Sequence, residues 1–134
     1  MHLNSIGTVR SPLREPADAP CQGDEGAPEA FIDVDPRFVA ALRGIEAGDR
    51  VLVLTWLDRA DRDTLEVHPR GDLDRPALGV FATRSPDRPN PVGLHEVQVA
   101  AVKGTTLTVR DLEALDGTPV VDIKPVLAAD PAKR

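Results

Sequence analysis

The sequence has few aromatic residues, one cysteine and no long apolar run, and each shortage excludes a kind of structure or interaction. It has three phenylalanines, one tryptophan (Trp56) and no tyrosine, which leaves little aromatic surface on which single-stranded bases could stack. Cys21 is the only cysteine, so no disulfide can form within the chain, as is usual in a reducing compartment. No apolar run approaches the roughly 20 residues that span a bilayer, and the N-terminus lacks a signal-peptide pattern. We expect a cytoplasmic protein that does not contact a membrane.

Recognisable metal and nucleophile patterns are also missing. The histidines His2, His68 and His95 and the single cysteine do not have the spacing of zinc ligands, and no serine belongs to a nucleophile elbow. No dinucleotide fingerprint or phosphate-binding loop occurs. The sequence therefore predicts no metal site and no covalent nucleophile. In its alternating strand pattern, His95 is expected at the surface or at an interface.

Length and charge set bounds on the remaining classes of function. A chain of 134 residues suits one domain with its own hydrophobic core, and we expect residues 1–134 to form that domain. The net charge of −6 opposes approach to a phosphate backbone unless basic residues gather on one face. Arg84 and Arg88 lie close together in the sequence, which favours such a local basic surface.

Short strand patterns separated by turn residues run through most of the chain and predict a mainly β fold. Residues 50–57 are apolar on both faces, so this strand is expected at the centre of the sheet. Lys103-Gly104 predicts a tight hairpin turn. The expected strands are residues 3–10, 30–34, 50–57, 64–67, 78–81, 95–102, 105–109 and 119–124, with a long loop over 11–29. The pattern favours a small β-barrel of short, mostly antiparallel strands, or a sandwich.

One short helix is expected directly after the second strand. Asp35 is a plausible N-cap, and Pro36 suits the first helical position. Phe38, Leu42 and Ile45 recur at i, i+4 and i+7 and form one apolar stripe. The stripe predicts a helix that closes a barrel end or covers a sheet face and has no catalytic role.

The segment 79–94, GVFATRSPDRPNPVGL, is the most informative part of the sequence. It contains three prolines within six residues, and each fixes its own φ and moves the preceding residue out of the helical region. The backbone is therefore stiff and extended, and it carries Arg84, Arg88 and Asn90. Two guanidiniums and an amide on a rigid loop suit a preformed polar binding surface. The alternative is a rigid surface turn between strands.

A second motif, DGTPVVDIKP, covers residues 116–125. Its Asp116-Gly117 pair predicts a tight turn. Asp122 and Lys124 then share one side of the following strand, with Ile123 on the other. The two charged side chains could pair with each other or reach a ligand together, and a plain turn with an exposed ion pair is the alternative.

Together these segments resemble the TsaA-like family, the tRNA (adenine-37-N6)-methyltransferases. Residues 6–12, IGTVRSP, are similar to the family's opening strand, residues 79–94 to its hallmark loop and residues 116–125 to its closing motif. The resemblance, to a short form without the extra C-terminal domain of longer members, implies a small β-barrel that forms a homodimer. It also implies methyl transfer from S-adenosyl-L-methionine to N6-threonylcarbamoyladenosine at position 37, in the anticodon loop of tRNA.

The resemblance also implies roles for particular residues. Cofactor contacts are implied at Pro20, Gln22, Arg59, Arg84, Leu94, Leu115, Asp116, Gly117 and Thr118. The loop residues Arg88, Pro89 and Asn90 are implied at the dimer interface beside the active site. Asp116 or Asp122 is the candidate that accepts the proton of the methylated nitrogen.

Three departures from the family's pattern bear on the substrate. Cys21, Asp58 and Val126 stand where members of the family often carry arginine, histidine and tyrosine. Because cationic groups are among the losses, two alternatives to the tRNA substrate stay open. One is an S-adenosyl-L-methionine-dependent methyltransferase with a small-molecule or other acceptor, and the other is a binding module without catalytic activity.

Overall fold

The computed structural model describes residues 1–20 and 26–127. Its strands are β1 (Gly7–Arg10), β2 (Ala30–Val34), β3 (Arg50–Trp56), β4 (Glu66–Val67), β5 (Leu78–Gly79), β6 (Val92–Lys103), β7 (Thr106–Arg110) and β8 (Pro119–Pro125). The short 3-10 helices in these ranges are η1 (Pro16–Asp18), η3 (Pro36–Leu42), η4 (Pro69–Gly71) and η5 (Val80–Ala82). None of the described helices has the length and apolar character needed to cross a membrane.

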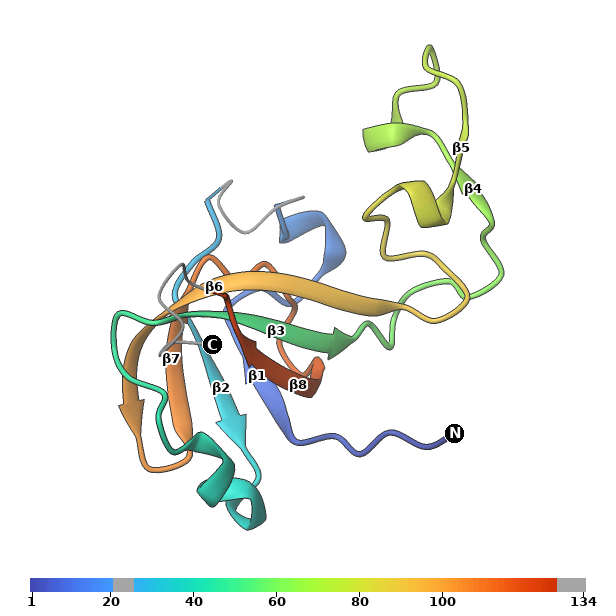
Figure 1. Cartoon of the computed structure of the whole chain (residues 1–134). Coiled ribbons are helices and arrows are strands. Elements are labelled where there is room, and N and C mark those ends of the chain that lie inside the picture. Colours follow the sequence, from blue (N-terminus) through green and yellow to red (C-terminus); the bar gives the residue numbers. More distant parts are fainter. Residues whose placement is uncertain (21–25, 128–134) are drawn as a thin grey trace.

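Six strands close into a barrel in the order β1, β2, β7, β6, β3, β8 (Figure 1). All neighbouring pairs are antiparallel, so the predicted small antiparallel barrel is confirmed and the sandwich alternative is wrong. Like every strand of the closed barrel, β3 has a neighbour on each side, β6 and β8. Closure removes the free sheet edges, so such short strands leave no unpaired edge in the barrel.

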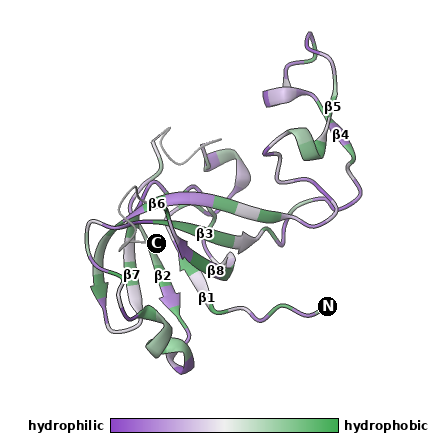
Figure 2. Cartoon of the chain, viewed as in Figure 1, coloured by the Kyte–Doolittle hydropathy of each residue, from purple (hydrophilic) through white to green (hydrophobic). Residues whose placement is uncertain are grey.

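The barrel core is built mainly from valine, because few aromatic residues are available to fill it. Along β3 the inward-facing Val51 and Val53 are buried, whereas the residues between them are only partly covered. Hydrophobic stretches follow the barrel strands in Figure 2. Burial of each such side chain contributes about 1.5–3 kcal/mol. The fully buried apolar residues include Val9, Ile32, Val53, Val97, Val99, Leu107, Val109, Leu112 and Val120.

The helix η3 closes one end of the barrel, as its apolar stripe predicted. Leu42 belongs to the buried core, and Phe38 and Ile45 pack against that core. The Asp35 carboxylate caps the helix by accepting a hydrogen bond from the amide of Arg37 at 3.0 Å. The helix is of the 3-10 type and ends at Leu42, so Ile45, the third residue of the predicted stripe, lies beyond it.

An arm, residues 57–91, links β3 to β6 and projects away from the barrel (Figure 1). It holds the two-stranded sheet β4–β5. The predicted strand 78–81 is shorter than expected, because its second half turns into the 3-10 helix η5. The arm exposes large apolar side chains, with Leu65 66 %, Leu73 79 % and Phe81 84 % exposed. Such a set of exposed apolar groups is typical of an interaction surface.

Two further strand boundaries differ from the sequence prediction. β6 begins at Val92 and not at His95, because its first residues pair with the end of β3, from Val92 opposite Trp56 to His95 opposite Val53. β1 begins at Gly7, where pairing with both β2 and β8 starts.

Candidate active site

The turn at residues 115–118 joins the barrel at the end of β1. Gly117 has a φ of +84°, a left-handed value that glycine adopts without strain, so the predicted tight turn is confirmed. The amides of Asp116 and Gly117 donate to the carbonyl oxygens of Leu13 and Val9, each at 2.7 Å. The turn is therefore held by backbone bonds to a neighbouring segment, and these two N–H groups are already paired.

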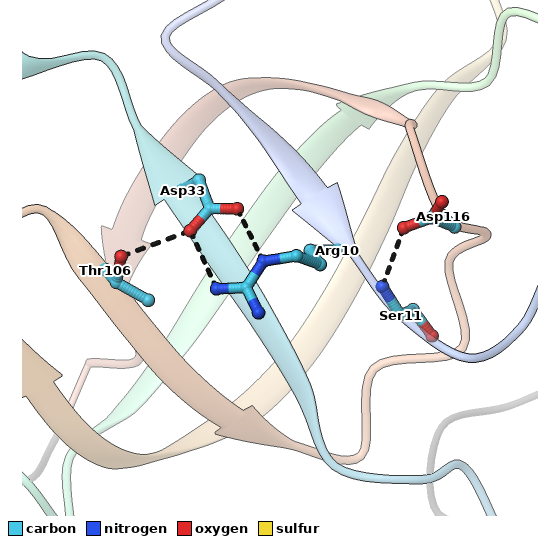
Figure 3. Close-up of polar contacts among 5 residues, drawn as sticks. All are labelled: Arg10, Ser11, Asp33, Thr106 and Asp116. Atoms are coloured by element: carbon cyan, nitrogen blue, oxygen red, sulfur yellow. Dashed lines mark hydrogen bonds and ion pairs between the residues drawn. The ribbon is translucent and has the colours of Figure 1, made fainter.

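The Asp116 carboxylate is also anchored, but only on one side. Its Oδ1 accepts a hydrogen bond from the Ser11 amide at 3.0 Å (Figure 3). Its Oδ2 lies 3.7 Å from Nη1 of Arg14, and the Asp116 side chain keeps 32 % of its surface exposed. One oxygen is thus fixed by the backbone while the other faces an exposed cationic side chain and solvent, which leaves an oriented acceptor for a ligand.

Arg59 reaches the same region from the other side. Its Nη1 donates to the carbonyl oxygen of Arg14 at 2.7 Å, and its Nη2 donates to Oε2 of Glu15 at 3.1 Å. The segment after β1 therefore connects Arg59 with the turn at 115–118. Pro20, further along this segment, is partly buried, and Gln22 lies outside the described residues.

The two arginines of the proline-rich loop have different surroundings. Arg88 turns inward, and its Nη2 donates to the carbonyl oxygens of Val80 and, at 2.7 Å, of Thr83. Arg84 is exposed, and within the described ranges 1–20 and 26–127 its side chain makes no hydrogen bond or ion pair. Arg88 thus fixes the loop, while Arg84 is presented as an unpaired guanidinium.

The rest of this loop is braced by the first residues of the arm. Nε and Nη2 of Arg62 donate to the Pro89 carbonyl at 2.8 Å and to Oδ1 of Asn90 at 3.2 Å. The amide of Arg88 donates to the carbonyl of Asp61 at 3.0 Å. The stiffness expected from the prolines is therefore reinforced by hydrogen bonds, and Pro89 and Asn90 are held in place by an arginine that the sequence analysis did not single out.

Leu94 and Asp122 lie on the outer wall of the barrel. Leu94 is 41 % exposed on β6. Asp122 on β8 lies 3.9 Å from Nζ of Lys124, and Ile123 packs against the core, so the predicted alternation along this strand is confirmed. Among the described residues, Asp122 makes no hydrogen bond or ion pair with the turn at 115–118, so only Asp116 belongs to the cluster around the turn.

Most of the expected site residues fall into two groups on one chain. Arg59, near the start of the arm, and the turn at 115–118 both contact the segment after β1, whereas Arg84 and residues 88–90 lie near the end of the arm (Figure 1). Within the parts of the chain that the structure describes, no group of three His, Cys, Asp or Glu side chains is arranged to hold a metal ion.

His95 is not at the surface, and that expectation is wrong. The residue is 5 % exposed; its Nε2 lies 2.7 Å from Oγ1 of Thr55, and its Nδ1 lies 2.5 Å from Oε1 of Glu113. His95 is in phase with the inward-facing Val97 and Val99 of β6. That phase was the signal that could have placed it inside; its polar partners, which make burial tolerable, come from distant parts of the sequence.

An ion pair on the outer wall holds β1, which carries Ser11 at its end. Nε and Nη2 of Arg10 donate to Asp33 at 2.9 and 3.1 Å, and the Thr106 hydroxyl donates to the same carboxylate at 3.1 Å (Figure 3). These bonds, that of Arg10 first, hold the pKa of Asp33 below its usual value of 3.8. The Arg10 guanidinium also stacks over the Phe31 ring, 4.3 Å from its centroid.

The architecture defines a class: a small closed barrel with an arginine-bearing arm and an acidic turn, unlike the doubly wound sheets that bind dinucleotides. The sequence from residue 8 to residue 130 matches the family described as the tRNA-methyltransferase O N-terminal domain. The chain belongs to this family, whose members use S-adenosyl-L-methionine. The resemblance seen in the sequence is therefore confirmed.

Relatives and solved structures agree with this assignment. A probable S-adenosyl-L-methionine-binding protein of Methanothermobacter thermautotrophicus is 46% identical over 93% of this chain and 89% of its own length. An S-adenosyl-L-methionine-binding protein of Archaeoglobus fulgidus is 44% identical over 92% of this chain and 88% of its own. The crystal structure of TrmO from Pseudomonas aeruginosa superposes on all of this chain with a TM-score of 0.75 and 30% identity. This chain spans 60% of the length of that TrmO chain.

Proposed function

We propose that this chain transfers a methyl group from S-adenosyl-L-methionine to N6 of N6-threonylcarbamoyladenosine at position 37, in the anticodon loop of tRNA. The cofactor supplies an electrophilic methyl group, and the protein supplies binding, orientation and electrostatics. Membership of the tRNA-methyltransferase O N-terminal domain family supports the reaction class. The observation that carries the site is the exposed Arg84 guanidinium, which forms no hydrogen bond or ion pair with the described residues and stands on a loop braced by Arg62 and Arg88.

The groups at the proposed site suit the chemistry of this cofactor. Arg84 offers the bidentate donors that a carboxylate requires. The turn at 115–118 offers acceptors, because the amides of Asp116 and Gly117 are already paired while Oδ2 of Asp116 stays accessible. Ribose hydroxyls and the adenine amine are donors, so an acceptor-rich turn is complementary to them. A Cβ at Gly117 would meet nothing within 4 Å, which leaves room beside the turn.

We propose Asp116 as the group that accepts the proton of the methylated nitrogen. Its orientation is fixed by the Ser11 amide, and a positioned base of this kind contributes typically about 10²–10⁴-fold. Asp122 is the second candidate, and its ion pair with Lys124 on the outer wall gives it less support. Asp116→Asn keeps an acceptor for Ser11 and removes the base. We expect this variant to bind cofactor and lose turnover, with Asp122→Asn as its matched control.

A homodimer would bring the two groups of site residues together. On one chain, Arg84 and residues 88–90 lie on a projecting arm (Figure 1), and this arm exposes Leu73 and Phe81 almost fully. We propose that the arm packs on a second copy of the chain and that its arginine-bearing loop joins the partner's turn. The exposed apolar side chains would then be buried, which favours association.

Mixing two inactive variants tests this composite site. Protomers carrying Arg84→Ala and protomers carrying Asp116→Asn are each expected to be inactive alone. After mixing, random pairing should restore roughly a quarter of the wild-type activity, because half of the pairs are mixed and each contains one intact site. No recovery from mixtures that sedimentation shows to be dimeric would contradict a composite site.

A calorimetric titration with S-adenosyl-L-methionine tests the role of Arg84. Arg84→Ala is expected to abolish measurable binding, because the loop then lacks its unpaired guanidinium. Arg75→Ala removes another exposed arginine of the same arm and should bind as the wild type does. Unchanged affinity in Arg84→Ala would refute the role of this residue.

The net charge of −6 favours one second candidate, a methyltransferase with a small-molecule or other acceptor. Mass spectrometry of tRNA nucleosides from cells with and without the gene separates the two. Loss of one N6-methylated nucleoside, together with salt-sensitive binding of tRNA, supports the tRNA substrate. Unchanged nucleosides with the cofactor still bound would support the other acceptor.

A further inference from the structure

A buried chain of three polar side chains lies inside the barrel. Thr55 of β3 is fully buried, His95 of β6 is 5 % exposed, and the Glu113 side chain is 19 % exposed. Oγ1 of Thr55 lies 2.7 Å from Nε2 of His95, and Nδ1 of His95 lies 2.5 Å from Oε1 of Glu113. None of these residues has a role in the proposed reaction, although buried polar groups in such a small core need a reason.

The donor and acceptor chemistry of these three side chains fixes the direction of both hydrogen bonds. A carboxylate only accepts, so Nδ1 of His95 carries a proton and donates to Glu113. In the neutral imidazole, Nε2 then accepts from the Thr55 hydroxyl. The order resembles that of a nucleophilic triad, but Thr55 has no exposed surface that a substrate could reach. The three hydrogen-bonded side chains therefore stabilise the structure and do not attack a substrate.

The strand register of the barrel explains how Thr55 and His95 come into contact. Thr55 pairs directly with Gly93, and Val53 pairs with His95, so Thr55 and His95 are diagonal neighbours on the inner face. A Cβ on Gly93 would lie 2.7 Å from Nε2 of His95 and closer still to Oγ1 of Thr55. The glycine thus provides the space in which the two polar groups meet.

Of the three residues, Glu113 is the one that connects the buried hydrogen bonds with the proposed cofactor site. It belongs to the connection from β7 to β8, which also carries the turn at 115–118. That connection leaves β7 at Asp111, which has a φ of +71°, a conformation that persists only when the surroundings determine it. Leu112 and Ala114 anchor the connection in the core, and the Glu113 carboxylate accepts a hydrogen bond from His95 in the barrel wall.

We propose that Glu113 and His95 are positioning residues for the turn at 115–118. This inference rests on the proposed function. Leu112 and Ala114 fix the depth of the connection in the core. The short hydrogen bond from His95, whose ring is itself held by Thr55, also fixes the orientation of the connection. Without that bond, the connection samples other arrangements, and only a fraction of molecules presents the turn correctly. The apparent affinity for a ligand of the turn falls by that fraction.

Calorimetric titration with S-adenosyl-L-methionine, together with hydrogen exchange of residues 111–118, tests the proposal. Glu113→Ala is expected to weaken binding about tenfold, the equivalent of one lost charge-assisted hydrogen bond, and to speed exchange at the amides of Asp116 and Gly117. Glu113→Gln keeps an acceptor for Nδ1 and should restore most of the affinity. Asp33→Ala also removes a hydrogen-bonded carboxylate, but from the outer wall, and should leave binding unchanged.

The outcomes separate this inference from the function on which it depends. If the wild type itself does not bind S-adenosyl-L-methionine, the proposed function fails, and so does the inference. If the wild type binds and Glu113→Ala binds equally well, only the inference is overturned. Equal losses in Glu113→Ala and Asp33→Ala would also overturn it, because they would reflect general destabilisation. Should Glu113→Ala fail to fold, Glu113→Asp keeps the charge but withdraws it from His95, and the same loss is expected.

Discussion

Gly93→Ala is the most discriminating single change in the barrel. The added methyl group would lie 2.7 Å from Nε2 of His95 and closer to Oγ1 of Thr55, well inside van der Waals contact. Both atoms belong to buried residues, so neither can swing into solvent to make room. The substitution therefore adds volume to a filled space and separates two hydrogen-bonded groups at once.

The expected cost has two parts. Overpacking a well-filled core costs about 1–3 kcal/mol, and leaving a buried donor or acceptor unsatisfied costs about 1–3 kcal/mol more. We therefore expect Gly93→Ala to lower the free energy of unfolding by about 2–6 kcal/mol, measured by urea denaturation. That is a large part of the roughly 5–15 kcal/mol that stabilises a typical domain.

Two further variants make the reasoning refutable. Gly79→Ala is the matched control, because a Cβ there meets nothing within 4 Å and its φ is −59°, so its stability should change little. Thr55→Ala removes the closest obstructing atom, and the double variant should lose less than the sum of the two single losses. If Gly93→Ala were as stable as Gly79→Ala, the packing argument around His95 would be wrong.

Three other changes follow from the same contacts. Arg10 holds the pKa of Asp33 below 3.8 in the folded protein, so the stabilisation from this pair is present above about pH 4 and is lost as the pH falls through the lower pKa of the folded state. Asp33→Asn should therefore flatten the dependence of the unfolding free energy on pH below about pH 4. The change should be under about 1 kcal/mol, because the pair is exposed. Arg88→Ala removes two loop hydrogen bonds, so trypsin should cleave after Arg84 faster. Leu42→Ala should cost about 2–3 kcal/mol in urea denaturation, since its side chain belongs to the core, and no loss would mean that η3 does not close the barrel.

Much of the fold could be predicted because it depends on local patterns. The strand Ala30–Val34 and the cap at Asp35 lie where the sequence analysis placed them. The left-handed φ of Gly117 was expected because an Asp-Gly pair favours a tight turn. Boundaries were less accurate where tertiary pairing decided them, as at the start of β6, which extends to Val92 to match the full length of β3.

The candidate site was only partly predictable, because its residues meet through long-range contacts. Arg84 and Arg88 look equivalent in the sequence, yet one is exposed and the other is bound to loop carbonyls. His95 was expected at the surface or at an interface, yet it is buried in the barrel, and its partners Thr55 and Glu113 lie 40 and 18 residues away in the chain. Nothing local in the sequence indicates which distant hydroxyl and carboxylate will satisfy a given imidazole.

By itself, the sequence determined the residues that stiffen the backbone, alternate along strands and form turns, since these properties follow from each residue and its near neighbours. It also carried the three motifs by which the family is recognised. Only the tertiary structure decided which polar groups are buried together and which of the two loop arginines, Arg84 or Arg88, bonds to loop carbonyls. Closing the barrel determines these contacts, because closure brings together side chains whose separation in the chain has no relation to their distance in space.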